Sequence, residues 1–232
     1  MLSWRKLGII GLNRTMTADM KEGYWSKWAK SYDSDGEFVV GKDIRQAIER
    51  RLLEERDLGK VIEFGCGTGF FTKVIAMNAK HVLATDLSDE MLDIAKSRFA
   101  QVQNVAIEKH DCGKTSFPTE RFDSVFMANL IHVIHNPSQC LRESYRILRE
   151  GGFVIIVDFT SHGMQLYDRI KLAIRYLRKW GVPTGHMRKN MSPRDLASLV
   201  ESAGFRVVSV QLLSGRANAL YLTGIKESVN DD

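Results

Sequence analysis

A glycine-rich stretch in the first third of the chain constrains its fold more than any other feature. Residues 61–69 read VIEFGCGTG, so an apolar, β-branched run leads directly into Gly65, Gly67 and Gly69. Glycine adopts positive φ without strain and lets a ligand approach the main chain closely. A glycine loop that joins a strand to a helix is typical of α/β sheets that bind nucleotides at the carboxyl ends of their strands.

The spacing of these glycines excludes two common nucleotide loops. The dinucleotide fingerprint G-x-G-x-x-G needs its third glycine where this chain has Phe70. Glu63, just before the loop, is unfavourable beside a pyrophosphate and suits a ligand that carries an ammonium group and no phosphates. No Lys-Ser or Lys-Thr pair follows the glycines, which excludes a P-loop.

From residue 60 onward, short apolar runs alternate with helical patterns. The pattern predicts strands at Lys60–Gly65, His81–Asp86, Val105–Asp111, Phe122–Asn129 and Phe153–Phe159. It predicts helices near 69–79, 88–100, 137–150 and from Ser192 to Gly204. Strands that alternate with helices indicate βαβ units and a parallel sheet. The last two runs, Phe205–Leu213 and Ala219–Lys226, are so closely connected that they must pair antiparallel.

Three acidic residues stand at or just before the ends of the first three predicted strands. Besides Glu63, these are Asp86, where a carboxylate can accept hydrogen bonds from ribose hydroxyls, and Asp111, which can accept one from an adenine amino group. Each alone is better explained as a loop acid that caps the next helix. Together, at one edge of a parallel sheet, they indicate a nucleoside ligand.

Several segments in this order resemble the class I S-adenosylmethionine-dependent methyltransferases, over roughly residues 24–226. The matching segments are EFGCGTG at 63–69, TDLSDEML at 85–92, HDC at 110–112, FDSVFMAN at 122–129, RILREGG at 146–152 and the closing hairpin. The resemblance implies an α/β fold: a Rossmann-like, doubly wound seven-stranded sheet, mostly parallel with an antiparallel terminal hairpin. It also implies an enzyme that uses S-adenosyl-L-methionine as its cofactor.

The resemblance assigns the cofactor contacts residue by residue. The assigned residues are Tyr24, Trp28, Tyr32, Glu63, Gly65, Cys66, Gly67, Gly69, Asp86, Leu87, Met91, Asp111, Cys112 and Asn129. The 65–67 backbone would lie against the methionine part, Asp86 would bind the ribose, and Asp111 and Cys112 would flank the adenine. For the three aromatic residues, packing of an amphipathic helix on the domain is an equally good explanation.

The loop after the fourth predicted strand, residues 129–137, is where the acceptor is expected. Methyl transfer from a sulfonium requires mainly alignment, and a general base only if the acceptor must lose a proton. His132 is the candidate base or acceptor contact, and a partly buried histidine that bonds the backbone is the alternative. We expect a small-molecule acceptor, methylated on O, N or S. An RNA or protein methyltransferase and a non-catalytic cofactor-binding module are the alternatives.

Positive charge is concentrated late in the chain. Residues 161–199 carry eight Lys or Arg against two Asp, so this segment is +6 while the whole chain is only +5. We expect residues 161–191 to form a basic helical lid, whose helix packs on the domain through a stripe of Leu166, Ile170, Ala173, Ile174 and Leu177. The alternatives for its basic face are an anionic membrane, contacted through 165–180, and RNA.

The remaining features concern the two ends of the chain, its location in the cell and metal binding. Residues 1–23 are expected to form an N-terminal extension and residues 227–232 a tail. No stretch approaches the roughly 20 apolar residues of a membrane span, and the short apolar run near the N-terminus does not resemble a secretory signal, so a cytoplasmic protein is expected. Cys66, Cys112 and Cys140 form no CxxC pair, and no His/carboxylate cluster is apparent, so no metal is expected.

Overall fold

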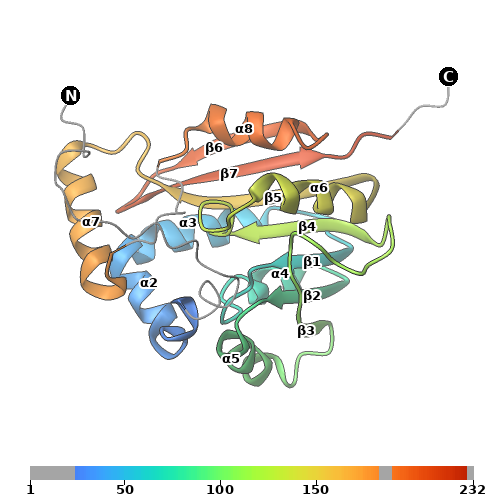
Figure 1. Cartoon of the computed structure of the whole chain (residues 1–232), viewed down its shortest axis with the longest axis horizontal. Helices are drawn as coiled ribbons and strands as arrows, with labels where there is room; N and C mark the ends of the chain where they lie inside the picture. Colours follow the sequence, from blue (N-terminus) through green and yellow to red (C-terminus); the bar gives the residue numbers. More distant parts are fainter. Residues whose placement is uncertain (1–23, 183–189, 229–232) are drawn as a thin grey trace.

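The protein is described here by a computed structural model that covers residues 24–182 and 190–228 (Figure 1). Its centre is a seven-stranded sheet in the order β3-β2-β1-β4-β5-β7-β6. The strands are β1 (Lys60–Phe64), β2 (His81–Asp86), β3 (Val105–Lys109), β4 (Phe122–Ala128), β5 (Leu148–Thr160), β6 (Arg206–Leu213) and β7 (Asn218–Ile225). The predicted fold class, including the number of strands and the terminal hairpin, is confirmed.

The direction of the strands determines where a ligand can bind. β1 to β5 run parallel, and β7 pairs antiparallel with both β5 and β6. The chain builds outward from β1 to β3 and then returns to place β4 on the other side of β1. In sheets of this kind, the carboxyl ends of the two strands at such a reversal leave a crevice between the loops that follow them. The loops after β1 and β4 are the glycine loop and the predicted acceptor loop.

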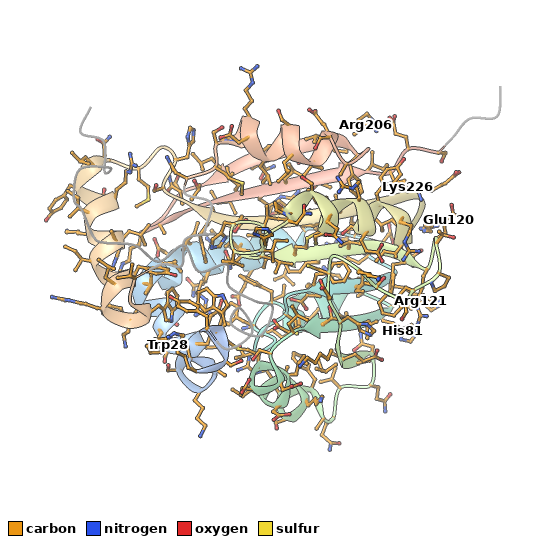
Figure 2. The ribbon with its side chains drawn as sticks, viewed as in Figure 1. Trp28, His81, Glu120, Arg121, Arg206 and Lys226 are labelled. Carbon is orange, nitrogen blue, oxygen red and sulfur yellow. The ribbon has the colours of Figure 1, made fainter. Side chains whose placement is uncertain are left out.

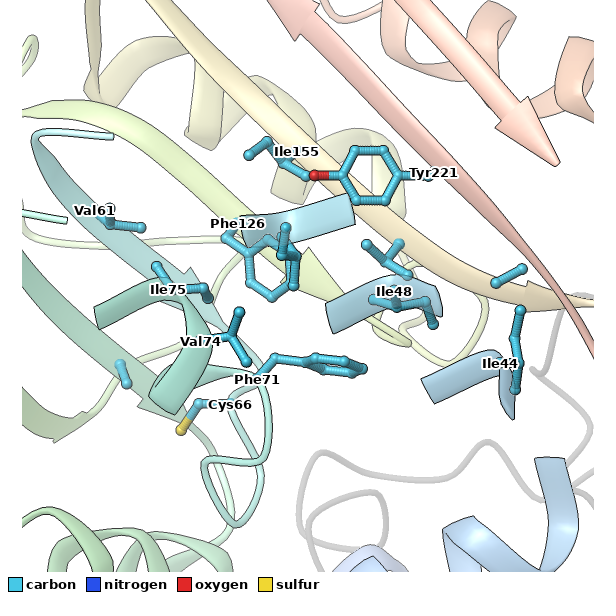
Figure 3. Packing of buried hydrophobic residues seen from close by; sticks show 14 of the residues in the cluster. Ile44, Ile48, Val61, Cys66, Phe71, Val74, Ile75, Phe126, Ile155 and Tyr221 are labelled. Carbon is cyan, nitrogen blue, oxygen red and sulfur yellow. The ribbon is translucent and has the colours of Figure 1, made fainter. Parts of the chain in front are cut away.

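Helices cover both faces of the sheet. They are α2 (Tyr32–Val40), α3 (Lys42–Leu53), α4 (Thr72–Asn78), α5 (Asp89–Phe99), α6 (Pro137–Ile147), α7 (Leu166–Trp180) and α8 (Pro193–Glu201), with a short 3₁₀ turn at Ala29–Ser31. On one face, Ile44 and Ile48 of α3 share a core with Val74 of α4 and Phe126 of the sheet (Figure 3). The opposite core joins the sheet to α6 and α8.

The helix starts follow from side-chain caps in the sequence. The Ser88 hydroxyl accepts a hydrogen bond from Met91 N at the start of α5, and Asn136 Oδ1 accepts one from Gln139 N at the start of α6. The expected start of α8 is confirmed, because Ser192 and Asp195 form a reciprocal capping box in front of it.

The structure differs from the sequence prediction at several element boundaries. The helix predicted over 137–150 ends at Ile147, because Leu148 already pairs with Phe122 as the first residue of β5. The third strand ends at Lys109, two residues before Asp111. Helix α3 was not predicted, although its buried residues recur at helical spacing.

The orientation of α7 was predicted wrongly. We expected its stripe of Leu166, Ile170, Ala173, Ile174 and Leu177 to face the domain, but these side chains are exposed. The helix packs inward through Leu172, Tyr176 and Trp180 instead. Trp180 contacts the rings of Trp25, Tyr32 and Tyr176 there, so the inward face of the helix is held by aromatic packing.

Several predicted features lie outside the described residues. They are the extension at 1–23, residues 183–189 of the expected lid insertion, and residues 229–232 of the tail. Within the described ranges, no helix is long and apolar enough to cross a membrane. The same part of the chain contains no group of three or more His, Cys, Asp or Glu side chains that could hold a metal ion.

Candidate cofactor and acceptor site

The glycine loop lies at the carboxyl ends of β1 and β2. Cys66 N donates a hydrogen bond to Thr85 O at 2.9 Å, which fixes the loop to the neighbouring strand. Cys66 itself is buried in the core beneath the loop (Figure 3), and burial raises the pKa of its thiol. Any contact between this residue and a ligand must therefore come from its backbone.

The three glycines are required for different reasons. Their φ angles are 70°, 55° and 80° at Gly65, Gly67 and Gly69, a region that disfavours other residues. A Cβ on Gly65 would lie 2.9 Å from Leu130 Cδ1, and one on Gly69 would lie 2.4 Å from Phe99 Cε2. These two glycines are therefore needed for packing of the protein itself.

Gly67 is the one glycine of this loop at which a Cβ would not clash with the protein. A Cβ built there would meet nothing closer than Tyr32 Cε1 at 3.8 Å and Met91 Sδ at 4.0 Å. Its N–H donates to Asp86 Oδ2 at 2.8 Å. The structure thus brings together four of the predicted cofactor residues, Tyr32, Gly67, Asp86 and Met91, around one partly exposed stretch of backbone that a ligand could approach closely.

Asp86 ends β2 and is half-buried. Its Oδ2 accepts from Gly67 N, and its Oδ1 accepts from Ser88 N at 2.9 Å. Each carboxylate oxygen has two lone pairs, so these bonds orient the group without using its whole capacity to accept from ribose hydroxyls. The next residue, Leu87, is largely exposed at the rim, whereas Met91 is buried.

Glu63 lies deeper than the other predicted acids. Only 2% of the residue is exposed, and Oε2 accepts a hydrogen bond from Thr72 Oγ1 at 2.6 Å. Burial raises the pKa of Glu63 to about 8, opposed by the bond from Thr72 and assisted by the nearby Asp86 charge. In this position Glu63 joins β1 to the start of α4, beneath the glycine loop.

Asp111 and Cys112 follow β3 at the outer end of the predicted adenine region. Asp111 is exposed, and its Oδ1 accepts from Gly113 N at 2.8 Å, which stabilises the turn after the strand. Cys112 is partly buried and packs on the core that includes α6. Both remain predictions as adenine contacts.

Aromatic residues from the N-terminal segment and α7 cover this edge of the sheet. Trp25 contacts Tyr24, Tyr32 and Trp180 edge-to-face with ring centroids 5.0–5.8 Å apart, and Tyr24 Oη donates to Trp180 O at 2.8 Å. Figure 2 shows Trp28 on this side, opposite His81 at the start of β2. The predicted N-terminal cover and the lid helix therefore form one aromatic cluster.

Asp33, which the sequence analysis did not identify, connects this cover to the glycine loop. Its Oδ1 accepts from Thr68 Oγ1 at 2.7 Å, and its Oδ2 accepts from Arg98 at 2.7 Å. Arg45 forms a further ion pair with it. The sequence offered one signal, an acid in the WSKWAKSYD segment whose neighbours resemble the cofactor cover.

His132 lies on the acceptor loop and is paired with a buried acid. Its Nδ1 bonds Asp158 Oδ1, and its backbone N–H donates to Asp158 Oδ2 at 3.0 Å. Asp158 is fully buried near the end of β5 and was missed by the sequence analysis. A single acid in the apolar run FVIIVDF was the available signal, because a buried carboxylate needs a partner.

The pKa of Tyr32 responds to charges in both the cofactor region and the acceptor region. Burial raises its pKa to about 12, and the carboxylates of Asp86 and Asp158 add to this rise. Asn129 joins the loop to β5 nearby, because its N–H donates to Val157 O and its Oδ1 accepts from Phe159 N. Because β2, β4 and β5 run parallel, Asp86 and the His132–Asp158 pair both lie at the carboxyl edge of the sheet, where Tyr32 lies next to Gly67.

The residues present fit an adenosine-containing cofactor that has no phosphate groups. The partly exposed backbone at Gly67 can be approached closely, Asp86 offers its carboxylate, and no Lys or Arg of the described residues bonds the 65–69 loop as a phosphate site would require. With the sheet order, this arrangement defines a Rossmann-like cofactor-binding enzyme.

Comparison with known proteins identifies the family of this cofactor-binding enzyme. Residues 62–156 match the model of a methyltransferase domain family. A demethylmenaquinone methyltransferase of Tropheryma whipplei (strain Twist) is 26% identical over 174 residues, covering 70% of this chain and 72% of that protein. A malonyl-[acyl-carrier protein] O-methyltransferase of Paenibacillus sp. (strain JDR-2) is 26% identical over 196 residues, covering 79% and 69%.

A solved structure shows the same fold. Phosphoethanolamine N-methyltransferase 2 of Haemonchus contortus, in complex with S-adenosyl-L-methionine, superposes with a TM-score of 0.66 at 15% identity, covering 92% of this chain and 61% of that one. The chain belongs to the class I S-adenosylmethionine-dependent methyltransferases, and S-adenosyl-L-methionine is its methyl donor.

Proposed function

We propose that the protein methylates a lipophilic small molecule at a group that loses a proton, a hydroxyl or an acidic carbon, and that His132 takes this proton. The carrying observation is the pairing of His132 with the buried Asp158 at the end of the sheet where Tyr32 and Asp86 lie. The relative named a demethylmenaquinone methyltransferase supports a lipophilic small-molecule acceptor.

The geometry of the histidine supports a base. Because Nδ1 faces the Asp158 carboxylate, the neutral ring carries its proton on Nδ1, and Nε2 can accept one from the acceptor. Burial of the ring disfavours its charged form, but the charge and hydrogen bond of Asp158 outweigh it, so the pKa of His132 is raised. A raised pKa makes the neutral ring a stronger proton acceptor.

The bound cofactor supplies a methyl group on a sulfonium sulfur, which is electrophilic without further activation. The protein orients the acceptor and removes its proton, and the aromatic cluster of Tyr24, Trp25, Tyr32 and Trp180 excludes water. The indole Nε1 of Trp180 is buried without an acceptor among the described residues. An unpaired buried donor is unfavourable, so we expect it to bond an oxygen of a bound molecule.

Transfer of tritiated methyl groups tests the proposed function. The protein would be incubated with labelled S-adenosyl-L-methionine and, separately, an apolar small-molecule extract, total RNA and total protein. We expect label in the extract and a loss of about 10²–10⁴-fold in the rate for His132→Gln. Cofactor binding, measured by calorimetry, should be unchanged in that variant.

Each other outcome contradicts a specific part of the proposal. Label that appears only in RNA or protein would establish the macromolecular alternative. Full activity of His132→Gln would show that His132 is not the base. The class of acceptor would then be identified only by which extract becomes labelled.

A further inference from the structure

The outward face of α7 is apolar, although it lies on the surface. Leu166, Tyr167, Ile170, Ile174 and Leu177 each leave between 46% and 71% of their surface exposed. At 100° per residue these five side chains fall within one arc of about 100°. We call this set the α7 outer face. Isolated exposed hydrophobic residues are ordinary, but five on one helix face indicate an interaction surface.

Cationic side chains border this face on both sides. Arg169 and Lys171 flank Ile170 in opposite directions around the helix, and Arg178 continues the side of Lys171; all three are exposed. The Lys171 ammonium lies 4.1 Å from the centre of the Tyr167 ring. The only acid of the helix, Asp168, points away from the outer face. An apolar arc with basic borders is the pattern of helices that lie in the interface of an anionic bilayer.

The opposite face of the same helix forms part of the cover over the site. Trp180 stacks on Tyr32 with ring centroids 6.1 Å apart, and its carbonyl accepts from Tyr24. Figure 1 shows α7 at one end of the molecule, on the side toward which β4 points. A surface in contact with the α7 outer face would therefore lie at the end of the molecule that also carries the loop after β4.

We propose that the α7 outer face docks the enzyme on an anionic membrane, with its apolar side chains in the headgroup region and Arg169, Lys171 and Arg178 contacting lipid phosphates. A second copy of the chain fits this surface less well, because a symmetric contact would bring the cationic borders of both copies together. The inference deepens the proposed function by naming the source of a lipophilic acceptor, the bilayer itself. Membrane binding can nevertheless be measured without any acceptor.

Vesicle flotation of the full chain tests the docking surface. The vesicles would be pure phosphatidylcholine, or phosphatidylcholine with 30% phosphatidylglycerol (roughly the anionic content needed for a clear surface potential). We expect binding to the anionic vesicles that weakens at high salt. Replacing Arg169, Lys171 and Arg178 with Gln should lower the partition coefficient about 100-fold, since each surface cation contributes about fivefold.

Matched variants distinguish the effect of this face on vesicle binding from the effects of net charge and general hydrophobicity. The triple variant Arg56→Gln, Lys80→Gln, Lys96→Gln removes the same charge from exposed sites elsewhere and should lower binding less than tenfold. Ile170→Glu with Ile174→Glu should abolish binding, whereas Val208→Glu, at an exposed position on β6, should not. Cofactor affinity, measured by calorimetry, confirms that each variant is folded.

Three results would overturn the inference. The first is absence of wild-type binding to anionic vesicles. The second is binding that the α7 variants and their controls reduce equally. The third is a wild-type dimer in sedimentation that Ile170→Glu converts to monomer without any vesicle binding, which would assign the face to a second copy. None of these results depends on methyl transfer, so they leave the proposed acceptor chemistry to its own test.

Discussion

At the scale of single residues, the His132–Asp158 pair makes the most specific prediction. Asp158 raises the pKa of His132, so the histidine becomes neutral only at a pH above the ordinary histidine value of about 6.5. A base must be neutral to act, and the rate with saturating cofactor and acceptor should therefore rise with pH and level off above that value. The measurement is the pH profile of kcat for the wild type.

The variant Asp158→Asn distinguishes positioning from a purely structural role. Asn can keep a hydrogen bond to the ring but carries no charge, so the inflection of the profile should move to lower pH while kcat falls about 10-fold or more. A profile that keeps its inflection with an unchanged kcat would show that another group titrates. A lower kcat with the inflection unchanged would show that Asp158 acts only on the shape of the loop.

Neighbouring glycines of the loop should respond differently to the same substitution. Gly67→Ala adds a methyl group at van der Waals distance from Tyr32 and Met91 without a clash, so it should cost about 1–2 kcal/mol of stability from its positive φ and weaken cofactor binding at least 10-fold. Gly69→Ala has the same φ penalty and also clashes with the Phe99 ring, so it should be clearly less stable. Thermal unfolding and calorimetric titration measure the two effects, and equal stability of the two variants would contradict the assignment.

Glu63 should make the free energy of unfolding depend on pH in a distinctive way. Its pKa is about 8 in the folded chain and near 4.5 in the unfolded chain, so the folded state holds an extra proton between these values. Stability from this group is therefore lost as pH rises from about 4.5 to 8, by at most about 1.4 kcal/mol per pH unit, and is constant above 8. Glu63→Gln keeps an acceptor for Thr72 and should remove this slope.

Urea unfolding of both proteins between pH 5.5 and 9 provides the comparison. The difference in unfolding free energy should increase in favour of the variant as pH rises. Parallel curves would mean that Glu63 is ionised in the folded protein throughout this range.

At the scale of elements, Asp33 holds α2 against both the glycine loop and α5. Asp33→Asn removes the charge that bonds Thr68, Arg98 and Arg45 at once, so the cover should loosen. We expect cofactor affinity to fall about 5- to 30-fold, corresponding to one or two charge-assisted hydrogen bonds. Asp93→Asn, on the exposed side of α5, is the matched control, and calorimetry that found equal affinities would reject this role.

The elements also show what a sequence can and cannot predict. The strand order and the glycine loop follow from local patterns, because period, β-branching and turn residues act within a few positions. The outward orientation of α7 does not, since apolar periodicity identifies an amphipathic helix without saying which partner its faces meet. Asp158 was missed for a related reason: its partner, His132, is 26 residues away, and only the parallel pairing of β4 and β5 brings them together.

At the scale of the whole molecule, the site and the α7 outer face are connected through shared contacts. Lys179 of α7 pairs with the buried Asp35 of α2 at 2.7 Å, and the Trp180 ring lies against Tyr32, whose own side chain is next to Gly67. Because burial of a charge is costly without a partner, this ion pair stabilises the contact of the two helices. Cofactor binding should therefore also change the stability of α7.

Hydrogen exchange with and without S-adenosyl-L-methionine measures this connection. A ligand that binds against Gly67 and Tyr32 should slow exchange in α2 and, through the aromatic contacts and the ion pair, in α7, while α8 on the far side of the sheet stays unchanged. In Lys179→Met the protection of α7 should be lost and that of α2 largely kept, whereas Lys171→Met should behave as the wild type. Cofactor-induced protection confined to the glycine loop and α5 would show that the lid helix and the site act independently.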